Sequence, residues 1–94
     1  MFDAVLEGPD RVRLEGRLDA AAAPRLLALL DTVDGSCVLE CQGLEYVSSA
    51  GLGVLLATYK RLSGAGHTIK LTGMRKLVRD VFRYSRMDTI FEVE

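Results

Sequence analysis

Two hydroxyl side chains, Ser48 and Ser49, stand next to each other where an extended sequence pattern gives way to a helical one. A serine at such a junction is a preferred helix cap, because its oxygen accepts a hydrogen bond from a free backbone N–H of the first turn. The same free N–H groups and the helix dipole also favour a phosphate, which adds roughly −1.5 to −2 charges. A capping serine can also be a phosphorylated one, so the junction predicts either role or both.

Nucleophilic catalysis by either serine would require a neighbouring base. The only histidine, His67, follows a glycine turn at the start of a predicted strand, and no acidic residue can be identified to orient it. The chain also lacks a phosphate-binding glycine-rich loop with its lysine, a complete dinucleotide fingerprint and zinc-ligand spacing. We therefore expect a protein that is not an enzyme and that uses no cofactor.

The two cysteines, Cys37 and Cys41, lie four residues apart in an apolar segment that predicts a buried strand. Four residues of strand span about 13 Å, whereas a disulfide needs Cα atoms within about 7 Å. A metal ion would need further ligands, and His67 is the only histidine available. The cysteines are expected to be small apolar core residues, and no metal site is predicted.

Length and composition indicate one small domain, residues 1–94, with a net charge of −1. That charge gives no electrostatic basis for binding nucleic acid. The longest apolar stretch, around Gly51–Ala57, is far shorter than the roughly 20 residues that a membrane-spanning helix needs. The N-terminus lacks the pattern of a signal peptide, so the protein is expected to be cytoplasmic and not membrane-spanning.

Strand patterns alternate with helical ones along the chain. Residues 2–7 and 11–18 are separated by a turn at Gly8-Pro9-Asp10, which predicts an antiparallel hairpin. Later strands are predicted at Cys37–Cys41, continuing extended over Leu44–Val47 after a break at Gln42-Gly43, at His67–Leu71, and as a last edge strand at Glu92–Glu94. Intervening helices imply mostly parallel pairing, and thus an α/β domain with a mixed four- to five-stranded sheet, an N-terminal hairpin and crossover helices.

Three helices are predicted between these strands. The first follows Asp19, a good N-cap, and ends near Asp34-Gly35. The second begins at the serines and ends at Gly64–Gly66, with Lys60 and Arg61 expected at its solvated end. The third carries an apolar stripe that continues as far as Phe91. Its basic residues indicate a solvated face or, alternatively, a surface for an acidic partner or phospholipid head groups: Arg75, Lys76, Arg79, Arg83 and Arg86.

Four short motifs, in order and in register, resemble the STAS domain of bacterial anti-sigma factor antagonists. They are Gly16–Asp19, Glu40–Leu44, Ser48–Gly53 with its continuation to Lys60, and Gly73 through the last helix to Phe91. Each motif alone is weakly specific, but the four together cover essentially the whole chain without large gaps. The resemblance implies a STAS-like fold and a regulatory protein that works by binding a partner.

In such a protein, the unmodified form binds an anti-sigma factor that is also a serine kinase, and this binding frees a sigma factor. The resemblance implies that the kinase phosphorylates the antagonist, that the phosphorylated form is released, and that a PP2C-type phosphatase resets it. The kinase holds ATP and Mg²⁺, so the antagonist needs neither.

Carried over by position, the phosphoacceptor falls on Ser49, with Ser48 as the alternative. The resemblance places Asp19 near this serine before the first helix, and Glu40 on an acidic position that ends a strand. With Ala50 and Gly51, these residues form the expected partner-binding set: Asp19, Glu40, Ser48, Ser49, Ala50 and Gly51. Ser48 departs from the family, which has an aspartate immediately before the phosphoacceptor.

A second interpretation stays open on the same residues. Some STAS proteins are constitutive subunits of larger assemblies, such as a membrane lipid-transport ATPase or a stress-signalling scaffold. The departure at Ser48 favours that class, whereas the Leu-Gly-Val-Leu-Leu continuation after Gly51 favours the antagonist.

Overall fold

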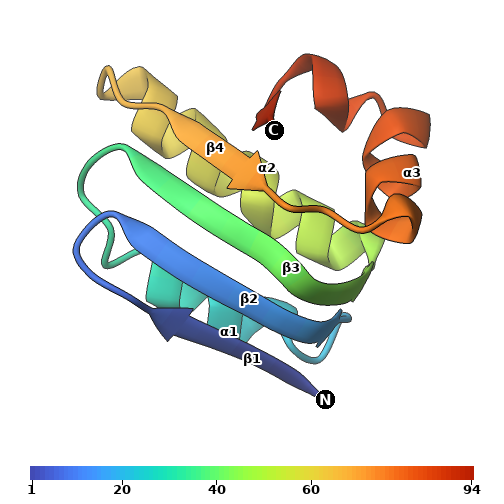
Figure 1. Ribbon diagram of the computed structural model, residues 1–94. Coiled ribbons are helices and arrows are strands. Elements are labelled where there is room, and N and C mark those ends of the chain that lie inside the picture. The colour runs from blue at the N-terminus through green and yellow to red at the C-terminus, as the bar shows by residue number, and fades with distance from the viewer.

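Five strands and three helices follow one another along residues 1–94, all of which the computed structural model describes (Figure 1). The strands are β1 (Phe2–Leu6), β2 (Arg11–Leu18), β3 (Cys37–Val47), β4 (Ile69–Thr72) and β5 (Glu92–Val93). The helices are α1 (Ala23–Leu30), α2 (Ser49–Gly64) and α3 (Lys76–Tyr84), and a 3-10 turn, η1, spans Met87–Thr89. The strands keep their chain order in the sheet, with β1 antiparallel to β2 and every later pair parallel. The predicted α/β architecture is confirmed.

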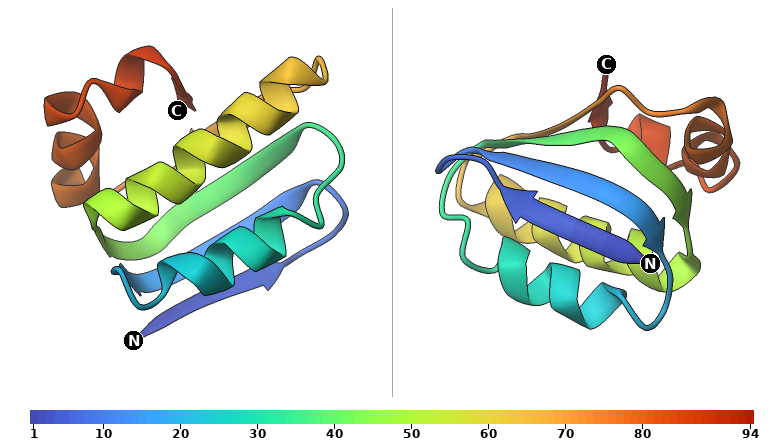
Figure 2. Two further views of the ribbon diagram at one scale, coloured as in Figure 1. Left: turned by 180° about the vertical axis from the view of Figure 1, so that it is seen from behind. Right: turned by 60° about the horizontal axis from the view of Figure 1, so that its bottom comes forward.

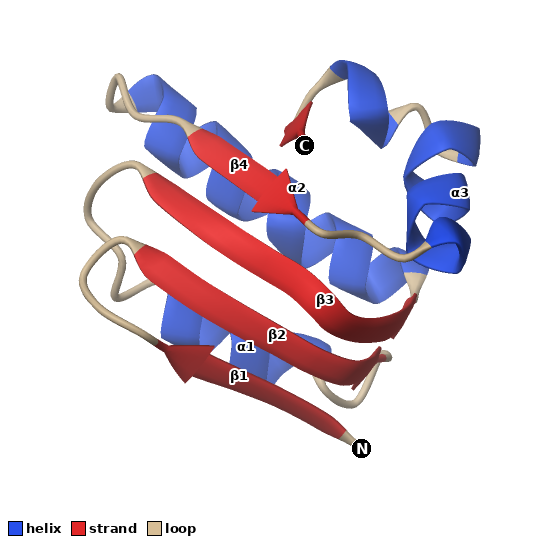
Figure 3. Cartoon of the chain, viewed as in Figure 1, coloured by secondary structure: helices blue, strands red, loops and turns tan.

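Helices α1 and α2 lie together on one face of the sheet (Figure 2), and the opposite face of β2 and β3 carries no helix (Figure 3). Along β2, the buried residues Val12, Leu14 and Leu18 face the helices, and the alternate positions are charged. Helix α3 stands apart, at the carboxyl end of the central strands (Figure 1). The serines lie at the carboxyl end of β3, where the chain enters α2.

The central strand β3 is continuous, so the predicted break at Gln42-Gly43 is wrong. Its pairing with β2 shifts by one residue between Arg13 and Glu15, and again between Gly16 and Arg17. Each shift is a β-bulge that adds one residue to β3, so the buried positions fall at residues 37, 39, 41, 44 and 47. A glycine within a strand pattern marked the first bulge, not a strand end.

Helix α1 is shorter than predicted at both ends, beginning at Ala23 and ending at Leu30. Asp19 does not cap the helix itself but the turn before it, where its Oδ1 accepts a hydrogen bond from the N–H of Ala22 at 2.9 Å. This turn uses the first three alanines, and Pro24 then lies in the first helical turn, as its missing N–H allows.

The apolar stripe that continues as far as Phe91 had suggested a longer α3. The C-terminal segment instead turns back on the domain after α3 ends at Tyr84. Arg86 adopts a left-handed backbone conformation with φ 64°, which ends the helical run. The turn places the Phe91 ring edge-on to Tyr59 and Phe82, with centroids 5.5 Å and 5.8 Å away. The segment then adds β5 to the edge of β4, as predicted.

Arg61 is exposed, as expected at the end of α2, but its guanidinium also binds the backbone at the end of α1. One guanidinium nitrogen, Nη2, donates to the carbonyl oxygens of Leu30 at 2.7 Å and Val33 at 3.0 Å. These carbonyls lie at and just beyond the C-terminus of α1, where backbone acceptors lack helical partners. The side chain therefore joins α2 to the end of α1.

We expect Arg61→Ala to lower the free energy of unfolding by about 1–2 kcal/mol, because two charge-assisted hydrogen bonds are lost at a half-exposed site. Urea denaturation measures this change. Lys60→Ala, at the exposed neighbouring position with no ion pair, is the matched control and should change stability by less than about 0.5 kcal/mol. Equal costs for both variants would show that Arg61 has no capping role.

Candidate functional site

The two adjacent serines have different surroundings. Ser48 has an extended backbone, with φ −83° and ψ 169°, and is the N-cap of α2. Its Oγ accepts a hydrogen bond from the N–H of Gly51 at 3.1 Å, and its side chain is partly buried. Ser49 is the first residue of the helix, is exposed, and makes no side-chain hydrogen bond. Ser48 thus acts as the helix cap, and the Ser49 hydroxyl is available to another molecule.

The carboxyl end of β2 holds the serine junction in place. Leu18 pairs with Val47 across the parallel β2–β3 ladder, and its carbonyl accepts a hydrogen bond from the N–H of Ser48 at 2.9 Å. A Cβ added to Gly51 would lie 2.6 Å from Leu18 Cγ, so only a glycine allows this close approach. The sequence pattern predicted that Leu18 ends a strand, but nothing in it indicated this positioning role.

Asp19 lies at the same edge of the sheet as Ser48, since each directly follows the end of one of two neighbouring parallel strands. Its carboxylate caps the turn before α1 and is half-buried. Ala50 is exposed beside Ser49 in the first turn of α2. The structure therefore brings together five of the six residues expected to form the partner-binding set.

Glu40 is the residue that the structure does not bring to this edge. It lies in the middle of β3, between Arg13 of β2 and Thr72 of β4, seven residues before the strand ends. Its carboxylate forms an ion pair with Arg11 at 2.8 Å on the open face of the sheet. The expectation that Glu40 ends a strand is wrong, because β3 passes through the bulge at residues 41–43 and continues.

The first turn of α2 is suited to a negative group. It contains no acidic side chain, and the first N–H groups of a helix have no partners within the helix. The 16-residue helix also directs the positive end of its dipole toward Ser49. A phosphate on this exposed hydroxyl would therefore be stabilised by the backbone and would leave the cap at Ser48 intact.

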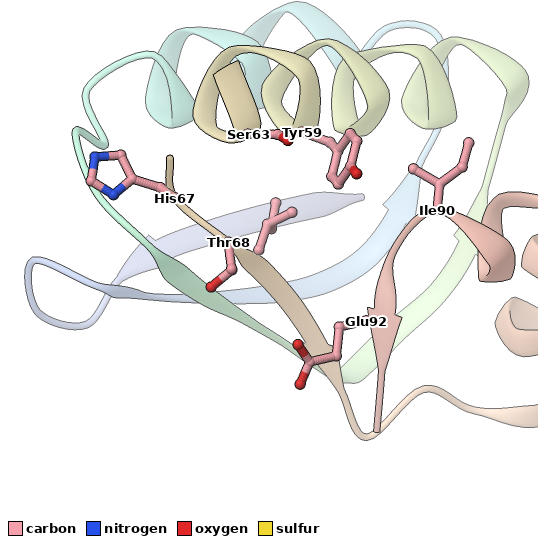
Figure 4. Close-up of a pocket in the computed structure, with 7 residues that line it drawn as sticks. Tyr59, Ser63, His67, Thr68, Ile90 and Glu92 are labelled. Atoms are coloured by element: carbon pink, nitrogen blue, oxygen red, sulfur yellow. The ribbon is translucent and has the colours of Figure 1, made fainter. Parts of the chain in front are cut away.

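A shallow cavity of about 210 Å³ lies toward the other end of α2, away from the serine junction (Figure 4). Tyr59, Ser63, His67, Thr68, Ile69, Ile90 and Glu92 line it. It gathers a serine, the only histidine and a carboxylate, but no hydrogen bond joins them, and Glu92 pairs with Lys70 at 3.4 Å. Figure 4 shows the His67 ring at the outer margin, directed away from Ser63. The cavity has no nucleophile–base pair, and Ser49 does not line it.

Cys37 and Cys41 are both buried and unpaired, as expected from their spacing. Burial raises the pKa of the Cys41 thiol to about 12 and also raises that of Cys37. Both thiols therefore stay protonated at neutral pH and are poor nucleophiles. No group of three or more histidine, cysteine or acidic side chains is arranged to hold a metal ion.

We expect Ser48→Ala to destabilise the protein by about 0.5–2 kcal/mol, because the N–H of Gly51 loses its partner at the helix start. Ser49→Ala removes the same hydroxyl from the adjacent position but breaks no hydrogen bond, so its effect should stay within about 0.5 kcal/mol. Thermal denaturation of the two variants compares them directly. A larger loss for Ser49→Ala would contradict the assignment of Ser48 as the cap.

The fold matches several solved structures over nearly its whole length. An anti-sigma factor antagonist from Mycobacterium paratuberculosis superposes with a TM-score of 0.81 and 20% sequence identity, covering 99% of this chain and 83% of that one. The Bacillus cell fate determinant SpoIIAA in its phosphorylated form gives a TM-score of 0.72 and 19% identity, covering 100% and 91% of the two chains. At these identities the structures establish a shared fold.

Sequence comparison gives a nearer relative. The protein named "Putative anti-sigma factor antagonist BtrV" of Bordetella bronchiseptica is 36% identical over 84 residues, which cover 85% of this chain and 72% of that protein. The family model described as "Mlab, STAS domain" matches residues 4–92. No helix of the chain has the length and apolar character needed to span a membrane. From this relative and the family match, the chain belongs to the STAS domain family.

Proposed function

We propose that this protein is an anti-sigma factor antagonist that binds its anti-sigma factor when unphosphorylated and releases it when Ser49 is phosphorylated. The observation that carries the proposal is the division of roles between the two serines. Ser48 is used as the helix cap, while the Ser49 hydroxyl is exposed and free at the start of α2. Modification of Ser49 would change the binding surface and not the fold.

The relatives support this function. The Bordetella relative is named as an anti-sigma factor antagonist, and SpoIIAA, which has the same fold, has been solved in both unphosphorylated and phosphorylated forms. Because this chain has an exposed serine at a helix start, the same kind of switch is physically available to it.

Release follows from the charge that a phosphate adds. An exposed hydroxyl can be covered by a partner at little cost, whereas burying a group with about two negative charges is expensive unless the partner supplies matching cations. The partner is a serine kinase that holds ATP and Mg²⁺. The Ser49 Oγ bonds to the γ-phosphorus of ATP, the bond to the β-phosphate oxygen breaks to release ADP, and the hydroxyl proton passes to a base of the kinase. A PP2C-type phosphatase hydrolyses the phosphate and restores the binding form in the cytoplasm.

The residues around Ser49 form the proposed contact surface. Ala50 is exposed beside Ser49, and Gly51 keeps the start of α2 close to β2. The partly buried side chains of Asp19 and Ser48 support the junction from below. Glu40 lies outside this surface, in the middle of the open sheet face.

A constitutive subunit of a larger assembly is the second candidate. It is favoured by Ser48, because a serine at this position leaves no carboxylate immediately before the Ser49 hydroxyl to orient it. The hydroxyl of Ser48 is itself already occupied by the hydrogen bond from the Gly51 N–H. In that case the same surface makes a permanent contact. Co-purification with an ATPase subunit and no change in binding after treatment with a kinase or phosphatase would favour this function.

The direct test mixes the purified protein with each anti-sigma factor kinase of its source organism and measures binding by calorimetry, before and after incubation with ATP and Mg²⁺. We expect one kinase to bind the unmodified protein and to lose it after ATP is added. If none binds, or if binding is unchanged by phosphorylation, the proposed switch is excluded.

A further inference from the structure

Charge is strongly segregated along this chain. The segment from Arg75 to Arg86 contains five of the twelve lysines and arginines but only one of the thirteen acidic residues, so its net charge is +4. The remaining residues carry a net charge of −5. A nearly neutral protein thus presents one compact basic element, α3 with its flanking residues, on an otherwise acidic molecule.

Part of this positive charge is not used within the fold. Lys76 and Arg83 both form ion pairs with Asp80, at 2.8 Å and 3.0 Å. Arg79 and Arg86 are exposed and make no ion pair or side-chain hydrogen bond. Their guanidinium groups are therefore free for an external carboxylate, which they can bind through two parallel hydrogen bonds.

Two large apolar side chains on α3 are also uncovered. Leu77 is 61% exposed and Tyr84 is 77% exposed, although Val78 and Phe82 of the same helix are fully buried in the core. The guanidinium of Arg83 lies over the Tyr84 ring, 5.4 Å from its centroid. Tyrosine and arginine are enriched at the energetic centres of protein interfaces, so the exposed part of α3 around Arg83 and Tyr84 has the composition of a docking site.

Helix α3 also packs against β3, the strand that leads to the serine junction. It stands near the carboxyl end of β3 in Figure 1. The side chain of Arg75, at its start, donates to the carbonyl of Gln42 in β3 at 2.9 Å. A partner that covers Ser49 and extends along the end of β3 would meet α3.

We propose that the exposed basic flank of α3, formed by Arg79, Arg83 and the following Arg86, is a second docking surface that binds an acidic patch on the anti-sigma factor. This inference rests on the proposed function, since it assigns part of the same interface. A compact acidic patch fits better than an extended polyanion, because the −5 charge of the rest of the molecule repels a membrane or nucleic acid that reaches beyond the helix.

The test uses the anti-sigma factor identified in the titration above and the full-length chain. Arg79→Glu and Arg86→Glu should each weaken binding by about tenfold at low salt, and the loss should shrink as added salt screens the charges. Lys60→Glu reverses an exposed, unpaired charge on α2 and is the matched control, with binding expected within about twofold of the wild type. Circular dichroism should show all three variants folded, because none of these side chains makes an ion pair.

The outcomes separate the two proposals. If the arginine variants bind like the wild type while Ser49→Asp does not, the switch stands and the α3 surface is excluded. If Lys60→Glu loses as much binding as Arg79→Glu, the effect is one of net charge, and α3 is not a specific surface. If the arginine variants lose binding to anionic phospholipid vesicles but bind the anti-sigma factor as the wild type does, the proposal is also overturned. Failure of the wild type to bind any anti-sigma factor would remove both.

Discussion

Ser49→Asp should weaken binding to the anti-sigma factor by at least about tenfold, whereas Ser49→Ala should bind as the unmodified protein does and should no longer respond to ATP. The aspartate places a charge at the exposed start of α2, where the partner would have to bury it. Alanine removes only a hydroxyl that makes no hydrogen bond within the fold. Calorimetric titration of both variants measures the two effects.

The matched control for this charge is Ser63→Asp. Ser63 is exposed on the same helix but 14 residues further along, beside the shallow cavity and away from the serine junction. Ser63→Asp should therefore leave binding to the anti-sigma factor within about twofold of the wild type. Equal binding by Ser49→Asp and Ser49→Ala would exclude Ser49 as the switch, and an equal loss for Ser63→Asp would reduce the effect to a change in net charge.

The second large effect is expected at Gly51. Its added Cβ would approach Leu18 Cγ at 2.6 Å and the Leu18 carbonyl oxygen at 3.1 Å, and Leu18 is fully buried. The start of α2 must then move away from β2, so we expect Gly51→Ala to lower the free energy of unfolding by about 1–3 kcal/mol. For a chain of this size, each kcal/mol corresponds to roughly 4–8 °C in Tm.

Gly53, two residues further along α2, provides the control. A Cβ at Gly53 would meet no atom within 4 Å, and the position is exposed within the helix. Gly53→Ala should therefore stabilise the protein by about 0.5–1 kcal/mol, through helix propensity alone. If both alanine variants shift Tm in the same direction, the close approach of α2 to Leu18 does not constrain the junction.

The alternation of apolar and polar residues was sufficient to predict the order and type of the elements. It predicted the N-terminal hairpin, the crossover helices and the parallel pairing, because each is set by local periodicity and connection length. It failed where the period changes within one element, as at the bulges of β3. There the extra residues keep Cys41, Leu44 and Val47 on the covered face. In sequence alone, such a change of period cannot be distinguished from a strand end.

The candidate site, too, combines a feature that the sequence predicted with contacts that only the structure shows. The serine–glycine pattern predicted a helix start, but only the three-dimensional arrangement assigns the cap to Ser48 and leaves Ser49 free. The roles of Leu18 at the junction and of Arg61 at the end of α1 depend on contacts between distant parts of the chain. Glu40 was misplaced because its expected position depended on where β3 ends.

The central claim is that Ser49 carries a phosphate in the cell. The most direct measurement is the intact mass of the protein purified from its native host, followed by fragmentation to map any modified residue. We predict a second species heavier by one phosphate, with the modification on Ser49 and not on Ser48. Phosphate mapped to Ser48, or an unmodified mass under all growth conditions, would contradict the account, and the unmodified mass would favour a constitutive subunit.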